Sequence, residues 1–465
     1  MSKTRIERDA LGELPVPDDA YHGVQTQRAV ENFPISGQRL RPSLDVALVQ
    51  VKRAAARVNQ ALGALDAARA DAIVQACDDV LAGRLGAPFV VDAFQAGAGT
   101  SQHMNVNEVL ANRANELLGA PRGSYSPVHP NDHVNLGQST NDVFPTALRL
   151  AARAELLPLQ VALQGLVAAL RERARAFDGV VKSGRTHLAD AAPVRLGQEV
   201  GAWASALAHH GARLTLAGEG LRVLGIGGSA VGTGLNCPPG YRQAMVRALS
   251  ELVGAELSAA DDPFEAMQSL APLVALSGAL RNLALELIRI GNDLRLLSSG
   301  PLTGLGELVL PAVQPGSSIM PGKVNPVMAE MLAMVCFDVI GRDATVALAA
   351  QAGQLELNVM MPAVAHALLP ALSQLAAAVT AFTQRCVVGL QADASRCARY
   401  AHQSPQLVTA LAPRLGYAQS AEIAKQAVAE RRTIREVVVE RGLLSDDEAA
   451  ALLDPRPLTE PETRR

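Results

Sequence analysis

The chain has 465 residues, of which 49% are hydrophobic and 19% are charged, which is enough apolar material for two or three domains with large cores. Its formal net charge is −3 and its pI is about 6.3, which excludes the basic field that attracts nucleic acid or an anionic membrane surface. Only 3% of the residues are aromatic, and this balance favours close-packed helices over sheets. We therefore expect a mainly α-helical protein that binds neither nucleic acid nor membranes.

The N-terminus and the cysteines indicate the compartment. The chain starts with MSKTRIERDALGE, which is charged and lacks the apolar core of a signal peptide. Its five cysteines are scattered, and no CxxC pair suits zinc binding or redox chemistry. Histidines and acidic residues do not cluster at metal-ligand spacing either. We expect a cytoplasmic protein with reduced thiols, whose chemistry needs neither a metal nor another cofactor.

The pattern of apolar residues divides the chain into three parts. Residues 1–140 mix short helical patches with turns that contain Gly and Pro, such as LPVPDDAYHG, and predict a small, mixed, mostly helical N-terminal domain. Residues 141–396 carry helical patterns longer than a usual globular helix, and these predict a central bundle of long helices. Residues 397–465 return to short patterns and predict a small helical C-terminal domain. The long patterns cover residues 146–177, 195–224, 264–299 and 327–382.

The long helices are hydrophobic around much of their circumference. A single four-helix bundle would leave apolar stripes in water, so we expect a homo-oligomer that covers them. The most membrane-like segment, 361–382, is interrupted by His366, Pro370 and other polar or helix-breaking residues. A helix buried inside a bundle explains this segment better than a membrane span does.

Four polar, glycine-containing islands stand out from the apolar background. Each lies near the end of a helical pattern, where unpaired backbone N–H groups favour an anion. Their side chains are mostly hydroxyls, amides and histidines, an inventory that suits a small dicarboxylate. The islands are AGAGTSQHMNVNE from Ala96, HPNDHVNLGQSTND from His129, SGRTHLADAAP from Ser183 and GSSIMPGKVNP from Gly316.

The last island is not a phosphate-binding loop. Five residues separate Gly316 from Gly322, where a phosphate loop has four between its glycines. Val324 follows Lys323 at the place of the hydroxyl that would bind Mg²⁺. Two serines and a lysine in this loop instead suggest proton chemistry on a carboxylate substrate.

We assign the island side chains to three parts of a dicarboxylate. One carboxylate receives hydrogen bonds from hydroxyls, the other pairs with a cation and an amide, and a third, smaller group faces the remaining residues. Three of the islands also have a structural interpretation: Ser139–Asp142 could be a helix N-cap, Thr100 and Ser101 part of a glycine-rich turn, and His187 a structural or surface histidine. The three predicted groups are Thr100, Ser101, Ser139 and Thr140; Lys323 and Asn325; and Asn141, Thr186 and His187.

The loop GSSIMPGKVNP closely resembles the signature GSSxMPxKxNP of the aspartase/fumarase superfamily. The resemblance extends over nearly the whole chain. It implies a small N-terminal domain, a long helical bundle and a small C-terminal domain. It also implies a homotetramer in which four subunits join their bundles, and in which each active site takes its islands from three subunits.

The resemblance further implies a lyase that removes a group β to a carboxylate and yields fumarate. Ser317 would be the base, stabilised by loop backbone N–H groups and by Lys323, and the product of proton removal would be an aci-carboxylate. Glu330 matches the family acid that pairs with the histidine, here His187. Two positions depart from the family pattern: His103 stands where Asn is usual, and Met361 stands where an acid or a base is usual.

The leaving group is predicted from the segments nearest the chemistry. AGAGTS from Ala96 and GQSTND from Gly137 resemble aspartate ammonia-lyases, whereas HGVQTQRAVENFPIS from His22 and MNVNEVLANRA from Met104 resemble class II fumarases. AGAGTS and GQSTND lie nearest the predicted chemistry, so we give them more weight. They predict a carbon–nitrogen lyase that deaminates L-aspartate reversibly, and dehydration of L-malate is the alternative. A structural relative without catalysis is a distant alternative.

Overall fold

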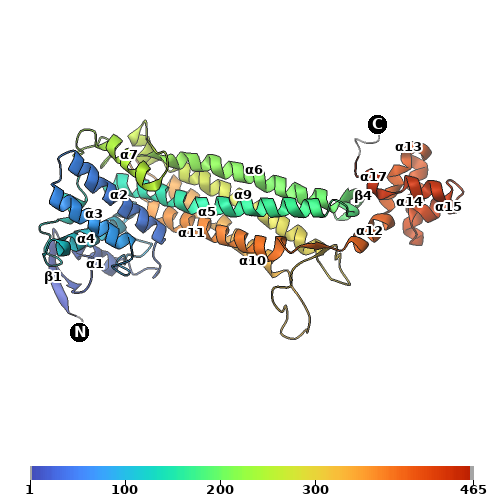
Figure 1. Cartoon of the computed structure of the whole chain (residues 1–465), viewed down its shortest axis with the longest axis horizontal. Coiled ribbons are helices and arrows are strands. Elements are labelled where there is room, and N and C mark those ends of the chain that lie inside the picture. Colours follow the sequence, from blue (N-terminus) through green and yellow to red (C-terminus); the bar gives the residue numbers. More distant parts are fainter. Residues whose placement is uncertain (1–2, 461–465) are drawn as a thin grey trace. The chain divides into compact units, whose positions relative to one another are not determined.

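Long α-helices dominate the structure, a computed structural model that describes residues 3–460 (Figure 1). This confirms the predicted mainly helical fold. The eight strands within these residues form only two-stranded pairs. The helices outside the five longest are α1 (Val24–Asn32), α2 (Pro42–Ala61), α3 (Ala67–Leu81), α4 (Thr100–Leu117), α7 (Tyr241–Val253), α8 (Pro263–Gln268), α12 (Ala394–Gln403), α13 (Ala412–Leu415), α14 (Tyr417–Glu430), α15 (Ile434–Glu440), α16 (Asp446–Leu452) and α17 (Pro455–Leu458). The strands are β1 (Thr4–Asp9), β2 (Gly12–Pro17), β3 (Val181–Thr186), β4 (Ala189–Arg195), β5 (Val223–Leu224), β6 (Ser258–Ala259), β7 (Leu308–Val309) and β8 (Gln391–Ala392).

Two compact units make up the chain, and each of the five longest helices contributes residues to both. The predicted domain boundaries after residues 140 and 396 stay a prediction. Unit 1 comprises Met1–Gln160, Ala212–Asn282 and Phe337–Ala376, and unit 2 comprises Val161–Gly211, Leu283–Cys336 and Ala377–Arg465. The five longest helices are α5 (Thr140–Ala176), α6 (Leu196–Glu219), α9 (Ala271–Leu297), α10 (Val327–Gln351) and α11 (Met361–Phe382).

The long patterns become helices at the expected places, but two of them are interrupted. The predicted run 327–382 is divided into α10 and α11 by an irregular segment. Asn358 explains the division: its Nδ2 donates to Ala349 O (3.0 Å) and Ala350 O (2.9 Å), and its Oδ1 accepts from Met360 N (2.8 Å). One amide therefore satisfies the last carbonyls of α10 and the start of α11. Similarly, the run 264–299 breaks between α8 and α9.

Two helical segments, Ala271–Leu297 and Met361–Val387, are long and apolar enough to cross a membrane by length and composition alone. The core helices of soluble proteins pass the same test. In the second segment, 61% of the most apolar window is buried inside the structure. Met361, one of the departures from the family pattern, is itself fully buried at the start of α11.

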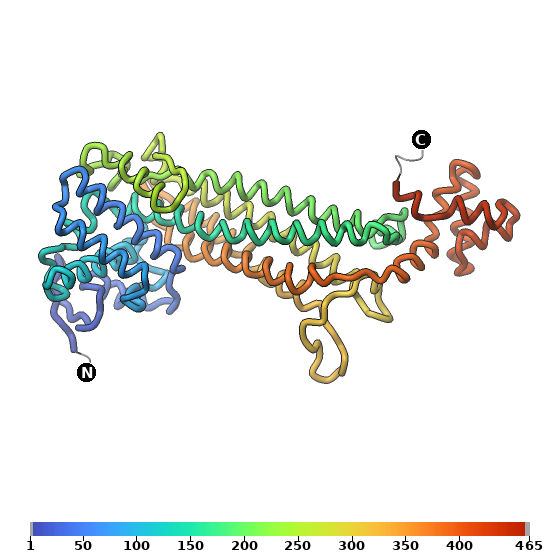
Figure 2. The backbone as a smooth tube through the Cα atoms, in the orientation of Figure 1, coloured from blue at the N-terminus to red at the C-terminus, as the bar shows by residue number. Residues whose placement is uncertain are grey.

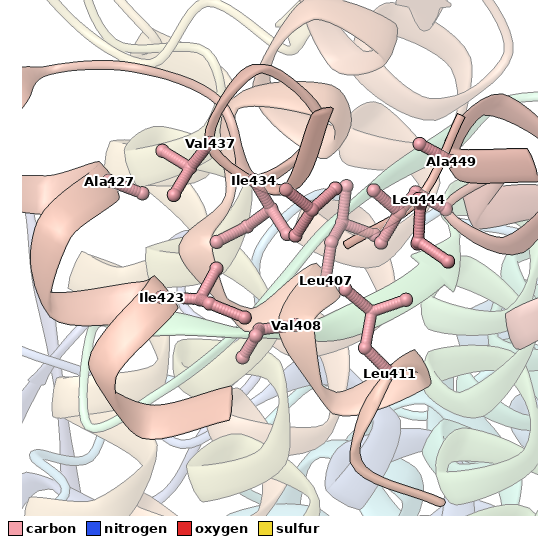
Figure 3. Close-up of a cluster of buried hydrophobic side chains, with 11 residues drawn as sticks. Leu407, Val408, Leu411, Ile423, Ala427, Ile434, Val437, Leu444 and Ala449 are labelled. Atoms are coloured by element: carbon pink, nitrogen blue, oxygen red, sulfur yellow. The ribbon is translucent and has the colours of Figure 1, made fainter. Parts of the chain in front are cut away.

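The C-terminal part of unit 2 has its own small core. Within residues 397–465, whose short patterns predict small helices, the segment 421–453 contributes to α14, α15 and α16. Helices α15 and α16 each begin with a capping box, Thr433 with Glu436 and Ser445 with Glu448. Residues 461–465 of this predicted domain lie outside the described residues. Figure 3 shows the buried cluster that these helices share, formed by Leu407, Val408, Leu411, Ile423, Ala427, Ile434, Val437, Val438, Leu444, Ala449 and Leu453.

Candidate active site

The first two predicted islands meet in unit 1 at the starts of α4 and α5. Gly99 precedes α4 with a left-handed backbone (φ 84°), and a Cβ atom there would lie 2.2 Å from the ring of Phe144 in α5. Only glycine satisfies both conditions, so this residue permits the two helix starts to pack closely. Thr100 is exposed at the start of α4, whereas Ser101 is buried and its Oγ accepts a long hydrogen bond from Ala96 N (3.4 Å).

Ser139 caps α5, as the structural interpretation of this island predicts. Its Oγ accepts a hydrogen bond from Asn141 N (3.2 Å), and its own N–H donates to Asp142 Oδ1 (2.9 Å). Because Ser139 Oγ acts as an acceptor in this cap, its hydroxyl proton is not used for capping. The unpaired N–H groups and the positive end of the helix dipole add to the attraction for an anion at this point.

A buried chain of side chains lies behind Thr140. Lys52 of α2 is fully buried, and its Nζ lies 2.6 Å from His103 Nε2. The other ring nitrogen of His103, Nδ1, lies 2.7 Å from Thr140 Oγ1. The departure at His103 is therefore connected directly to a predicted carboxylate donor.

A glycine-rich stretch, residues 225–234, also holds the start of α5. The N–H groups of Gly227 and Ser229 donate to Asp142 Oδ2 (2.9 and 3.0 Å), and Asn141 Nδ2 donates to Ala230 O (2.8 Å). Burial raises the pKa of Asp142 to about 6, while these backbone N–H groups oppose the rise. The stretch is absent from the predicted islands, although five glycines in ten residues are a signal of close backbone approach.

The third island forms the tip of a β-hairpin in unit 2. Thr186 ends β3 and Ala189 begins β4, so His187 and Leu188 make the turn. Both have positive φ, 56° and 59°, in a two-residue turn of the kind that Asn-Gly usually supplies. Non-glycine residues held in this conformation are concentrated at functional sites. The turn presents Thr186 and His187 to solvent.

A buried ion cluster joins this hairpin to the segment that leads into the loop of residues 316–326. The carboxylate of Glu307, which is 0% exposed, accepts hydrogen bonds from Arg185 Nη1 (2.9 Å to each oxygen) and lies 3.1 Å from Lys182 Nζ. Lys182 Nζ also donates to Glu199 Oε2 (3.1 Å). Lys182 and Arg185 belong to β3, and Glu307 stands directly before β7, so the cluster fixes two elements to each other.

The fourth island is the irregular excursion of the chain between α9 and α10, drawn as a tube in Figure 2. Within it, Ser317 Oγ accepts hydrogen bonds from the backbone N–H groups of Ile319 (3.2 Å) and Met320 (2.9 Å). Two donors aimed at one hydroxyl oxygen would stabilise negative charge on it. The contacts are compatible with the predicted serine base, and the role of Ser317 stays a prediction.

The loop is also clasped at its base. Gly316 N donates to Lys323 O (2.8 Å), and Asn325 Nδ2 donates to Gly316 O (2.6 Å). Within residues 3–460, no donor is recorded for Asn325 Oδ1. Lys323 is exposed, and in the part of the chain that the structure describes its ammonium group has no ion pair. A free cation is therefore presented by the same loop as Ser317.

The predicted site residues thus fall into two groups. Among residues 3–460, no hydrogen bond or ion pair joins His187 to Glu330, and no group of three or more His, Cys, Asp or Glu is placed to hold a metal ion. The pairing of His187 with Glu330 and the meeting of the two groups stay predictions. Unit 1 holds Thr100, Ser101, Ser139, Thr140 and Asn141, and unit 2 holds Thr186, His187, Ser317, Lys323, Asn325 and Glu330.

Gly99→Ala is expected to destabilise the protein and to abolish most activity, because the new methyl group meets Phe144. An alanine held at positive φ lowers the free energy of unfolding by about 1–2 kcal/mol, and overpacking lowers it by about 1–3 kcal/mol more. Gly119→Ala is the matched control: Gly119 follows the same helix with φ 80° and has open space where a methyl group would be added. Thermal unfolding compares the two variants. Equal losses of stability would show that the contact with Phe144 is unimportant.

Known proteins resemble this chain over nearly its whole length. Residues 12–341 match the family described as Lyase, and residues 407–460 match the family described as Fumarase C C-terminus. The class II fumarate hydratase of Thermus aquaticus is 46% identical over 98% of both chains. The aspartate ammonia-lyase of Bacillus subtilis is 42% identical over 98% of this chain and 96% of its own. The solved fumarate lyase:delta crystallin of Brucella melitensis has 49% identity and a TM-score of 0.95, over 98% of this chain and 100% of its own.

These likenesses contradict the predicted aspartate deamination. Of eight highly similar curated relatives, seven are named class II fumarate hydratases, with identities of 45–48%, and one is named an aspartate ammonia-lyase, with 42%. The prediction gave most weight to Ser101 and Thr140. Ser101 is buried and bonded to its own turn, so it was a poor guide to the leaving group. The alternative, dehydration of L-malate, is favoured instead.

Proposed function

The chain belongs to the aspartase/fumarase superfamily, and from that premise we propose that it is a class II fumarate hydratase, which interconverts L-malate with fumarate and water. The observation that carries the proposal is the likeness to class II fumarate hydratases over 98% of both chains. Members of the superfamily act on small dicarboxylates, and the island side chains provide donors for two carboxylates.

Ser317 is the proposed base. Its alkoxide, stabilised by the N–H groups of Ile319 and Met320, takes a proton from the methylene carbon of malate. The electron pair that is released moves into the adjacent carboxylate and forms the aci-carboxylate. Its collapse to fumarate expels the hydroxyl group from the neighbouring carbon, and that group takes up a proton and leaves as water.

Donors at the starts of α4 and α5 stabilise the aci-carboxylate, because its second negative charge develops where their protons point. Ser139 and Thr140 are the proposed sources of these protons, with Ser101 supporting the turn. Thr100 joins them when its hydroxyl turns away from Gly97 O, to which it donates across 3.3 Å. Lys323 and Asn325 hold the other carboxylate through a charge-assisted pair.

A third set of side chains surrounds the leaving hydroxyl group. Asn141, Thr186 and His187 face it, and His187 is the proposed proton donor for the departing water. Glu330 is proposed to orient His187 and to stabilise its positive charge, as the resemblance implies. The strained turn at His187 then serves to hold the ring at the tip of its hairpin.

The complete site is proposed to form in a homotetramer. The long helices expose large apolar side chains, including Leu216 (75% exposed), Phe337 (60%) and Leu348 (66%), which an isolated subunit would leave in water. Sedimentation is expected to find activity only in a species of about 194 kDa, four times the 48.6 kDa chain. An active species of the mass of one chain would contradict the shared site.

The leaving group is tested by offering L-malate and L-aspartate side by side to one purified preparation. Fumarate, followed by its ultraviolet absorbance, is expected from malate and not from aspartate. The reverse reaction is the control: fumarate with ammonium ions should yield malate only. Fumarate formed from aspartate but not from malate would refute the proposal, while leaving the proposed base and carboxylate donors in place.

A further inference from the structure

The ammonium group of Lys52 lies in a closed pocket of hydrogen-bond acceptors in unit 1. Besides His103, its Nζ contacts Asn135 Oδ1 and Gln138 Oε1, each at 2.9 Å. The two amide groups cannot turn round, because Asn135 Nδ2 donates to Gln138 O (3.2 Å) and Gln138 Nε2 donates to Val134 O (3.1 Å). Lys52 must therefore donate one N–H hydrogen bond to each amide oxygen. Only the third site on Nζ, an N–H or a lone pair, faces His103.

The state of that third position determines the tautomer of His103. Burial and the neighbouring cation of Lys52 hold the pKa of His103 well below its ordinary value, so the ring is neutral and has one N–H. When Lys52 is an ammonium ion, it donates to Nε2, and the ring proton is on Nδ1. When Lys52 is a neutral amine, its lone pair accepts a proton from Nε2, and Nδ1 is bare.

The tautomer in turn determines what Thr140 can do. With a proton on Nδ1, the ring donates to Thr140 Oγ1 across 2.7 Å, and the threonine keeps its own proton for another acceptor. With a bare Nδ1, Thr140 must donate to the ring and presents only a lone pair elsewhere. The first state attracts a carboxylate, and the second repels it.

We propose that Lys52 and His103 are positioning residues that make the Thr140 hydroxyl a hydrogen-bond donor to the substrate carboxylate. This inference rests on the proposed function only in placing a dicarboxylate at Thr140. Neither residue touches the substrate; they act through the direction of one O–H bond. The hydrogen bonds from Lys52 to His103 and from His103 to Thr140 fix the direction of the Thr140 O–H bond before the substrate binds. Such a preorganised donor stabilises an aci-carboxylate effectively.

The surroundings of Lys52 give the hydrogen-bonded series Lys52–His103–Thr140 a pH dependence. Asp142 of α5 and Cys77 of α3 both act electrostatically on Lys52, and Asp142 acts in the same way on the buried Tyr241 of α7. Burial lowers the pKa of Lys52 to about 7, while Asp142 opposes the fall. Because only the protonated chain makes Thr140 a donor, dicarboxylate affinity should fall as the pH rises above about 7. Because a single proton is involved, the affinity can fall by at most tenfold per pH unit.

Calorimetric titration with succinate, a dicarboxylate that cannot react, tests the chain between pH 6 and pH 8.5 in the assembled protein. The wild-type affinity is expected to fall by roughly tenfold from pH 7 to pH 8.5. His103→Asn places an amide N–H near the position of Nδ1, and this donor does not titrate, so binding should lose most of that dependence. His103→Gln reaches towards Lys52 but not towards Thr140, and should bind about 10- to 100-fold more weakly at pH 6.5.

Thermal unfolding of both variants separates this role from a structural one. A structural role for His103 would lower the unfolding temperature and leave the slope of affinity against pH unchanged, and that result would overturn the proposal. A flat wild-type profile would also overturn it, so the test does not depend on how well the variants fold. Because succinate does not react, the result is independent of whether malate is the substrate. Failure to dehydrate malate would refute the proposed function alone.

Discussion

Ser317→Ala is expected to lower kcat for L-malate by at least about a thousandfold, within the range for an essential acid–base group and its positioning. The variant removes the oxygen that accepts the N–H groups of Ile319 and Met320, and with it the proton acceptor. Succinate affinity and sedimentation should be unchanged, because the loop is clasped by other atoms. Steady-state kinetics with malate measures the effect.

Ser318→Ala is the matched control for this prediction. Ser318 is the next residue of the same loop and is exposed, and within residues 3–460 its hydroxyl accepts no backbone hydrogen bond. Its removal should change kcat less than threefold, which is about 0.7 kcal/mol in the barrier. If Ser317→Ala kept more than about a tenth of the activity, or if both serines were equally important, Ser317 would not be the base.

Lys323→Met is expected to weaken succinate binding by about 2–5 kcal/mol, which corresponds to at least thirtyfold in the dissociation constant. The methionine keeps the length of the side chain and removes the charge that the loop presents, so one carboxylate loses its charge-assisted partner. Calorimetric titration at pH 6.5 measures the change.

Lys425→Met, on an exposed face of α14, is a control for the overall change in charge. It should leave succinate affinity unaltered, since exposed charges beyond about 10 Å are screened at physiological salt. Unchanged affinity in Lys323→Met, or an equal loss in both variants, would show that Lys323 does not hold the substrate.

The long helices could be predicted because their apolar residues recur with the 3.6-residue period of an α-helix. The break at Asn358 could not, because it depends on which carbonyls one amide reaches after folding. Ser139 shows that two interpretations of a motif need not exclude each other: it caps α5, and its predicted contact with a carboxylate stays a prediction. Sequence could suggest both uses but could not choose between them.

Lys52 is the part of the site that sequence reasoning missed most completely. In the segment VALVQVKRAAARV it looks like an ordinary surface lysine, since a single charge in a helical pattern is usually solvated. Its importance depends on acceptors from positions 103, 135 and 138, which only the fold brings together. The available signal was its position on the apolar face of α2, where Leu48, Val49, Ala55 and Ala56, three and four residues away, are buried.

The ion cluster around Glu307 has a consequence for how the protein can evolve. Its two cations and two carboxylates balance one another, so losing Lys182, Arg185 or Glu307 leaves a net charge in a largely buried cluster, at a cost of up to about 3–5 kcal/mol. Substitutions at Lys182, Arg185 and Glu307 are therefore tolerated mainly as compensated pairs. A change at Lys182 or Arg185, in the hairpin that carries His187, is therefore expected to require a matching change at Glu307, directly before β7.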